Sequence, residues 1–140
     1  MILPEMICFA LYSANHAMQR VYQPLLAKFG LTYPQYLTLL TLWAEDGRTV
    51  GDLSRALQLE SNTLTPLLKR MEAQGLVARA RVAEDERQVR VTLTDRGRAL
   101  QAETAGLSTC IFDACGLAVD ELTALRHQIT SLRDRLRLSE

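Results

Sequence analysis

Apolar residues recur every three or four positions along most of the 140-residue chain, and this spacing predicts a mainly α-helical protein. A proline is typical of a first helical turn and a glycine of a helix end, so Pro4 and Gly30 bracket a first helix that runs to about Lys28. The apolar positions of this helix are Ile7, Leu11, Met18, Val21 and Leu25.

Three further helices are expected before residue 75. Thr32 is a good N-terminal cap for the second helix, which should end before the turn residues Asp46 and Gly47. Thr49 caps a short third helix, and a longer fourth helix starts near Ser61–Thr63. The inward side chains are expected to be Leu37, Leu40 and Trp43 in the second helix, Val50, Leu53 and Leu57 in the third, and Leu64, Leu67, Leu68 and Met71 in the fourth.

The pattern changes after Gly75, which ends the fourth helix. Leu76–Val82 and Val89–Leu93 have the composition of short strands, and the polar residues 83–88 between them predict the loop of a β-hairpin.

The C-terminal part is predicted to be helical again. Thr94 or Asp95 caps a long helix to about Cys115, and Asp120 caps a last helix that reaches Leu136. In total, about six helices and one small hairpin wing form the pattern of a winged helix-turn-helix. An all-α domain in which the hairpin is incidental is the alternative.

A winged helix-turn-helix places its second helix in the major groove of DNA. Here the helix over residues 61–74 would do so, because burial of its apolar stripe turns short polar side chains and two cations outward. The residues expected to face DNA from this helix are Ser61, Asn62, Thr63, Thr65, Lys69 and Arg70. Arg87, at the hairpin tip, suits a minor groove or a phosphate.

Composition narrows the class of protein. With 48% hydrophobic and 23% charged residues, the chain has the balance of a soluble globular protein, and its length fits one domain over residues 1–140. The formal net charge is zero, but residues 69–98 hold eight basic against five acidic side chains. The apolar stretch 1–14 is too short for a membrane span and lacks a basic leader, so a cytoplasmic protein without a membrane partner is expected.

Three cysteines occur, namely Cys8, Cys110 and Cys115. An odd count in a chain expected to be cytoplasmic argues against a disulfide framework, which leaves buried thiols or a reactive one. His16 and His127 form no zinc-binding spacing with the cysteines, so neither a metal nor a cofactor is expected.

Several segments resemble one family of repressors. DER at 85–87, followed by VRVTLTDRG at 89–97, is similar to the wing signature of the MarR family of winged-helix repressors. CFALYSA (8–14), GLTYPQYL (30–37) and NTLTPLLKRME (62–72) are similar to the organic-hydroperoxide regulators of that family, the OhrR subgroup. The resemblance is good over residues 6–98 and weaker from 99 onward.

The resemblance implies a homodimer that binds a pseudo-palindromic operator as a repressor and leaves it when an organic hydroperoxide oxidises Cys8. Residues 32–98 would form the winged helix-turn-helix, and residues 1–31 and 99–140 would supply dimerisation helices. In this subgroup two tyrosines hydrogen-bond the sensing thiolate, and they correspond to Tyr22 and Tyr33.

The wing arginine of the subgroup and its aspartate partner correspond to Arg87 and Asp85. One departure is Asn62, where the subgroup usually has glycine. This change lies near the DNA and bears on operator preference.

Cys8 must be ionised to attack a peroxide, because the thiolate is the nucleophile. No Lys, Arg or His is close to it in sequence, so tyrosine hydroxyls and a helix N-terminus are the expected donors to the sulfur. Tyr22 lies 14 residues further along the same helix, which is about 21 Å at 1.5 Å per residue, so it must reach Cys8 from the other subunit. Tyr12, one turn away, is the neighbour expected within the chain.

Oxidation begins with a sulfenic acid, which can condense with a second thiol. Cys110 and Cys115 are the candidates, and five helical residues turn them about 140° apart, so at most one should meet Cys8. Cys110 is preferred because it lies farther from the helix end, and Cys115 remains open.

Two other functions compete with the redox switch. A MarR-type repressor released by a small aromatic ligand would share the DNA-binding part and would not need Cys8. A thiol peroxidase would need a catalytic arginine, a general base or a CxxC motif, and none is evident, so an enzyme is not expected.

Overall fold

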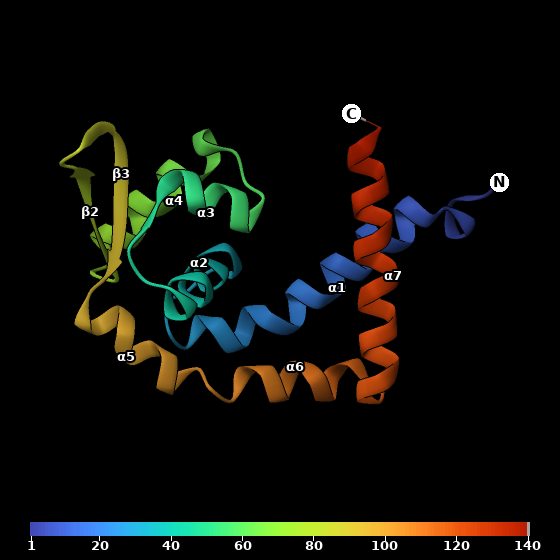
Figure 1. The fold of residues 1–140 in the computed structure, drawn as a ribbon. Helices are drawn as coiled ribbons and strands as arrows, with labels where there is room; N and C mark the ends of the chain where they lie inside the picture. The colour runs from blue at the N-terminus through green and yellow to red at the C-terminus, as the bar shows by residue number, and fades with distance from the viewer. Residues whose placement is uncertain (140) are drawn as a thin grey trace. The chain divides into compact units, whose positions relative to one another are not determined.

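The computed structural model describes residues 1–139 and divides the chain into two compact units, Met1–Gly106 and Leu107–Glu140, which are described separately. The elements of the first unit are η1 (Leu3–Glu5), α1 (Ile7–Ala27), α2 (Tyr33–Ala44), β1 (Arg48–Thr49), α3 (Val50–Leu57), α4 (Ser61–Ala73), β2 (Val77–Val82), β3 (Asp85–Leu93) and α5 (Asp95–Glu103) (Figure 1). Those of the second unit are α6 (Leu107–Cys115) and α7 (Val119–Leu138). Within residues 1–139, no helix is both long and apolar enough to cross a membrane.

Threonine caps place three of the helix starts where the sequence predicts them. Thr32 Oγ1 accepts a hydrogen bond from the Gln35 amide at 3.4 Å, and the Gln35 side chain accepts one from the Thr32 amide at 3.1 Å. Thr49 and Asp52 form the same reciprocal pair at 3.1 and 3.2 Å at the start of α3. Because each side chain satisfies an amide that the helix leaves unpaired, these starts are encoded locally.

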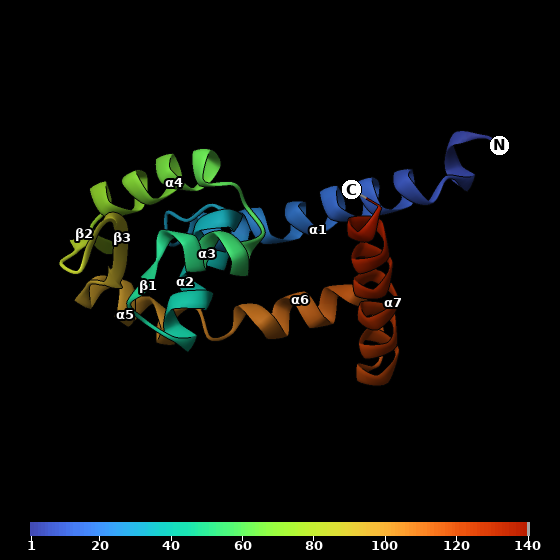
Figure 2. The ribbon, with the colours of Figure 1, turned by 45° about the horizontal axis from the view of Figure 1, so that its top comes forward.

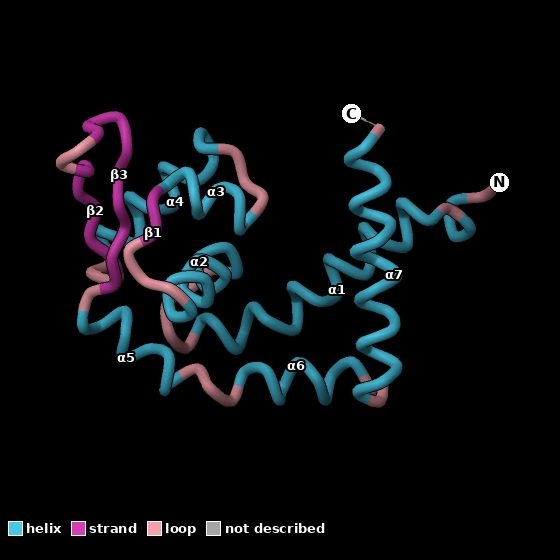
Figure 3. Tube along the Cα trace, in the orientation of Figure 1, coloured by secondary structure: helices cyan, strands magenta, loops and turns pink. Residues whose placement is uncertain are grey.

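The three strands form one antiparallel sheet in the order β1-β3-β2 (Figure 3). The predicted hairpin is present, but the predicted loop over residues 83–88 is wrong, because β3 already begins at Asp85 and only residues 83–84 turn. Register pairs Val77 with Leu93 and, beyond a bulge, Val82 with Asp85. The charged residues at the tip therefore belong to strand β3, where Asp85 pairs with Val82, although their composition resembles that of a loop.

The core of the first unit lies between α2, α3, α4 and the inner face of the sheet. The stripe predicted for α4 is confirmed, with Leu64, Leu67, Leu68 and Met71 all buried. The register predicted for α2 is wrong, since Leu40 is 42% exposed whereas Leu39 and Leu42 are fully buried. This helix contacts α1, α3, α4 and α5, so its buried surface is wide and includes the polar Thr38, whose hydroxyl donates to the Pro34 carbonyl at 2.8 Å.

The single long helix predicted from residue 94 to residue 115 is wrong, and residues 1–139 therefore contain seven α-helices where about six were expected. Thr94 caps α5, which ends at Glu103, and α6 begins at Leu107. Asp120 does not cap the last helix, because the N-terminal cap is Ala118, whose amide donates to the Glu121 side chain at 3.0 Å. At the break between α5 and α6 and at the start of α7, the residue pattern was compatible with more than one helix boundary.

A close contact joins the wing to α5 and α2. Thr94 Oγ1 donates to the Gly75 carbonyl at 2.6 Å, and the Thr94 amide donates to the Leu76 carbonyl at 3.1 Å. Trp43 Nε1 donates to the Gly97 carbonyl at 2.9 Å. A Cβ atom on Gly97 would lie 2.1 Å from the Leu76 carbonyl oxygen, so only glycine fits between the start of β2 and the first turn of α5.

Gly97→Ala is expected to destabilise the protein by about 1–3 kcal/mol, the usual range for overpacking a close contact. Chemical denaturation measures this difference. Gly106→Ala is the matched control, since a Cβ there meets no atom within 4 Å, and it should leave the free energy of unfolding nearly unchanged. Equal stability of the two variants would contradict the proposed contact.

Candidate nucleic-acid interface and redox site

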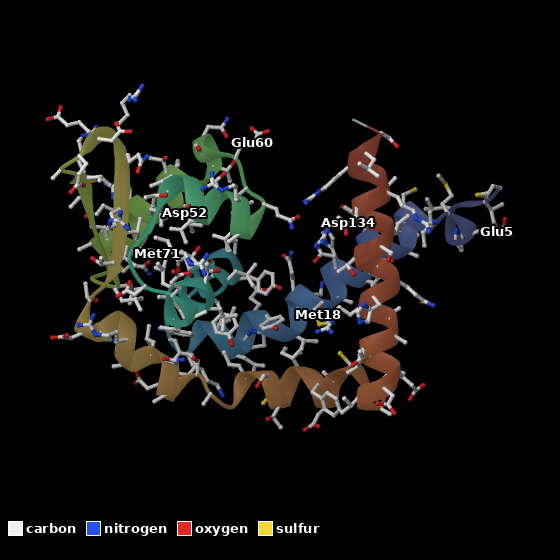
Figure 4. The ribbon with its side chains drawn as sticks, viewed as in Figure 1. Glu5, Met18, Asp52, Glu60, Met71 and Asp134 are labelled. Carbon is white, nitrogen blue, oxygen red and sulfur yellow. The ribbon has the colours of Figure 1, made fainter. Side chains whose placement is uncertain are left out.

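Helix α4 presents a polar face opposite its buried stripe. Ser61, Asn62, Thr63, Lys69 and Arg70 are exposed, as expected, and Thr65 is half-buried. The N-terminal cap residue, Glu60, makes no capping hydrogen bond with its side chain, and Figure 4 labels it beside the start of the helix. The first turn therefore offers short hydroxyl and amide groups to a ligand that approaches α4 from outside.

The wing holds Arg87 in a defined direction. The Asp85 carboxylate accepts from the Arg87 amide at 3.1 Å and from its Nε at 3.2 Å. The Arg87 side chain is nevertheless 91% exposed, because the aspartate contacts only one edge of the guanidinium. The aspartate thus orients the arginine and leaves most of its donors outward.

Two further arginines near this face were not identified from the sequence. Arg55, on α3, donates to Asp52 at 2.6 Å, and Arg79, on β2, pairs with Glu72 of α4 at 3.1 Å. Asp52 and Arg55 have the i, i+3 spacing of an ion pair on one helix, so this pair could have been predicted from the sequence. The second joins residues seven apart in different elements, and only the packing of β2 beside α4 brings them together (Figure 2).

Cys8 is the second residue of α1 and is exposed. Tyr12 lies one turn along the same helix, as expected, and its ring contacts that of His16 in a tilted arrangement with the centroids 4.4 Å apart. Within the described chain no cysteine forms a disulfide. Cys8 is thus accessible to a small oxidant in the single chain.

Tyr22 and Tyr33 meet where α1 passes α2. Their ring centroids are 4.8 Å apart, and Tyr36 lies 6.1 Å from Tyr22 in the same cluster. Burial raises the pKa of the Tyr33 phenol above 10.0. Burial also raises the pKa of Tyr36, and the neighbouring Tyr33 raises it further. In both cases the neutral phenol, which can donate a hydrogen bond, is favoured over the charged phenolate.

Cys8 and this tyrosine pair are far apart within one chain. Helix α1 is continuous from Ile7 to Ala27, and its internal proline, Pro24, lies beyond Tyr22. Fourteen residues along an α-helix span about 21 Å, well outside hydrogen-bond range. Because the Tyr33 ring lies 4.8 Å from that of Tyr22, it is also out of hydrogen-bond reach of Cys8 within the chain.

The other two cysteines lie in the second unit. Cys110 is exposed within α6, and Cys115, the last residue of that helix, is half-buried. Across residues 1–139, no three histidine, cysteine or acidic side chains are grouped so that they could hold a metal ion.

A cavity of about 550 Å³ opens beside the tyrosine pair in the first unit. Its walls come from the C-terminal half of α1 and the start of α2, and they include His16, Arg20, Gln23, Leu26 and Tyr33. It combines one cation and several hydrogen-bonding groups with apolar surface, which is the composition of a small-molecule site.

Comparison with known proteins gives three informative relatives. The chain is 49% identical to the HTH-type transcriptional regulator TtmR of Methylorubrum extorquens, over 96% of its own length and 69% of the relative's. It is 40% identical to the organic hydroperoxide resistance transcriptional regulator of Bacillus subtilis, over 97% and 92%. The structure of reduced AbfR bound to DNA superposes with a TM-score of 0.80 at 38% identity, covering 93% of this chain and 91% of that one.

The family described as "Transcriptional regulator SarA/Rot" matches residues 20–104. The chain belongs to this MarR-like family of winged-helix transcriptional regulators. Membership confirms the resemblance drawn from the four segments and the fold class, a mainly helical winged helix-turn-helix. It also agrees with the position of α3, α4 and the β2–β3 wing, which are the parts of a winged helix that contact DNA.

Stability should depend on pH through the buried phenols. A raised native pKa means that, above pH 10, the folded protein holds protons that the unfolded chain has lost. The free energy of unfolding is therefore expected to fall as the pH rises through the raised pKa of Tyr33. Tyr33→Phe should make this fall shallower, leaving the part due to Tyr36. Identical pH dependence of the two proteins in denaturant titrations would contradict the assignment.

Proposed function

We propose that this protein is a homodimeric repressor that binds a pseudo-palindromic operator while Cys8 is reduced and releases it when an organic hydroperoxide oxidises Cys8. The observation that carries the proposal is the close pair of Tyr22 and Tyr33, whose ring centroids are 4.8 Å apart, with Tyr22 on the same helix, α1, as the exposed Cys8. The DNA-binding residues are those of α4 together with the wing pair Asp85 and Arg87.

Dimerisation would complete the sensor. A partner whose α1 runs antiparallel would bring its Tyr22 and Tyr33 to the Cys8 of the first chain, which removes the 21 Å separation. Each of the terminal helical regions carries large apolar side chains that the single chain leaves exposed, as an interface between copies requires. These side chains are Ile2, Ile7 and Met18 in the N-terminal region and Val119, Leu125, Ile129 and Leu136 in α7.

Oxidation of Cys8 by a hydroperoxide needs no cofactor, because the hydroperoxide is itself the oxidant. The Cys8 thiolate attacks the distal oxygen of the hydroperoxide, the O–O bond breaks, and the alkoxide leaves as an alcohol after taking a proton. The product is Cys8 sulfenic acid, which condenses with a second thiol to form a disulfide and water. Cys110 is the preferred second thiol, with Cys115 and an external thiol as alternatives.

Loss of the thiolate and growth at the sulfur would remove the hydrogen bonds from the phenols. A shift of α1 would then change the spacing of the two α4 helices, which must match half-sites about 34–36 Å apart. The regulator relatives, one of them named for organic hydroperoxide resistance and one solved reduced on DNA, support this reading.

Cys8→Ser should bind operator DNA as tightly as the parent and stay bound after cumene hydroperoxide is added. The serine hydroxyl is not oxidised, whereas the thiolate is. A gel-shift assay combined with non-reducing mass analysis measures release and identifies the modified sulfur. Cys110→Ser and Cys115→Ser identify the second thiol, because the variant that lacks it should still be oxidised at Cys8 but should not form the disulfide. Peroxide release of Cys8→Ser comparable to that of the parent would overturn the proposed switch.

The position of the phenols across the dimer can be tested by mixing subunits. Tyr22→Phe homodimers should form sulfenic acid about tenfold more slowly, as for the loss of one charge-assisted hydrogen bond. A heterodimer of one Cys8→Ser chain and one Tyr22→Phe chain keeps one intact pair only if Tyr22 acts on the partner's cysteine. Trapping with dimedone should then proceed at the rate of a Cys8→Ser/parent heterodimer. A slow rate in the mixed dimer would place the interaction within one chain.

A repressor released by a small aromatic acid is the second candidate, and the cavity lined by Arg20 and Tyr33 favours it. An aromatic carboxylate there would pair with Arg20 and stack against Tyr33. The two functions separate experimentally, because such a ligand would still release Cys8→Ser from DNA, whereas a hydroperoxide would not.

A further inference from the structure

A cleft of about 420 Å³ separates the recognition helix from the wing. One wall is the start of α3, another is the first half of α4, and the third is formed by β2 and the beginning of β3. Its polar lining includes Thr49, Arg55, Ser61, Thr65, Arg79 and Arg87. Three arginines and three hydroxyl groups thus line one cleft. Of these six residues, only Ser61, Thr65 and Arg87 were predicted from the sequence to face DNA.

Each of the three arginines is held by a carboxylate that does not line the cleft. Asp52 holds Arg55 at 2.6 Å, Glu72 holds Arg79 at 3.1 Å, and Asp85 holds Arg87 at 3.2 Å. A guanidinium has five N–H donors, and each of these pairs uses only one or two of them. The carboxylates therefore orient the side chains and leave donors that can point into the cleft.

Arg55 lies over the start of α3. A Cβ atom built on Gly51 would be 3.6 and 4.0 Å from the two terminal nitrogens of Arg55, so the guanidinium rests beside the first turn of this helix. Figure 4 labels Asp52, its partner, at the same end of α3. The start of α3 is itself capped by Thr49 and Asp52, so the guanidinium of Arg55 is the cation that this helix offers to the cleft.

The geometry of duplex DNA determines which anion can reach this place. A winged helix that places α4 in the major groove and its wing in the adjacent minor groove must let one sugar–phosphate backbone pass between them, because that backbone separates the two grooves. We propose that this cleft binds a phosphodiester of that backbone, with Arg55 as its central ligand and Arg79, Thr49 and Thr65 beside it. The proposal rests on the DNA binding proposed above and deepens it.

The paired carboxylates also determine selectivity. Three acidic groups behind three arginines nearly cancel the net charge, so an isolated phosphate ion gains little from the cleft. A phosphodiester already positioned by α4 and the wing needs only well-directed donors. The cleft thus suits the backbone of a docked duplex rather than free phosphate, and millimolar inorganic phosphate should compete no better than sulfate.

The test compares Arg55→Ala with Arg96→Ala in the full chain. Arg96 is a matched control, because it is also an exposed arginine paired with a carboxylate at 2.6 Å, that of Glu103, but it lies on α5 and does not line the cleft. Binding is measured to the duplex that the parent selects from a random-sequence pool, at several salt concentrations. Arg55→Ala should lose about tenfold in affinity and flatten the plot of log K against log salt by about one unit, whereas Arg96→Ala and Arg55→Lys should keep the parent slope.

A neutral methylphosphonate scanned along the same duplex locates the contact. One position between the α4 site and the wing site should weaken binding of the parent and leave binding of Arg55→Ala unchanged. An unchanged salt slope for Arg55→Ala, or equal sensitivity of both proteins at every position, overturns the phosphate cleft.

The outcomes also separate this inference from the proposed function. A parent that binds a duplex and is released by hydroperoxide, together with an Arg55→Ala variant of unchanged slope, overturns the cleft alone. A parent that selects no duplex overturns both. Flattened salt dependence in Arg55→Ala with peroxide release intact supports both, because Arg55 is remote from the chemistry of Cys8.

Discussion

The close contact at Gly97 is the constraint on which the first unit depends. The start of β2 and the first turn of α5 approach so closely that a side chain at this residue has no room, and Trp43 of α2 donates a hydrogen bond to the same peptide. Wing, α5 and α2 are therefore held in one arrangement. The buried stripe of α4 packs within this arrangement, and Ser61 and Thr65 of α4 line the same cleft as Arg87 of the wing.

The tyrosine pair is linked to this body by side-chain amides. Gln35, buried two residues after Tyr33, donates to the Gln74 side chain at 2.9 Å, and Gln74 donates to the Gly30 carbonyl at 3.1 Å. Gln74 caps the end of α4, so the start of α2 and the end of the recognition helix are joined by one hydrogen-bonded chain. In the proposed switch, this hydrogen-bonded chain is the route by which a displacement of α1 against Tyr33 would reach α4.

A net charge of zero is compatible with DNA binding by this protein. Each arginine of the cleft is paired with a carboxylate that orients it, so the cleft carries little net positive charge. Binding then depends on where donors point and less on long-range attraction. The pairing of arginines with carboxylates explains why the net charge of the sequence did not indicate DNA binding. The pattern along α4 and the wing was informative, because it reports which face each element buries.

Features encoded within a few residues could be predicted from the amino-acid sequence alone. They are the threonine caps, the buried stripe of α4, the existence of the hairpin, and the distance along α1 that separates Cys8 from Tyr22. Tertiary structure decided the rest. The strand start at Asp85, the short strand β1 and the buried face of α2 depend on partners distant in the chain, and so does the pairing of Arg79 with Glu72. The spacing of apolar residues shows whether a segment is a helix or a strand. Strand register, helix boundaries and contacts between distant side chains depend on which neighbouring elements bury the segment, and these neighbours are distant in the sequence.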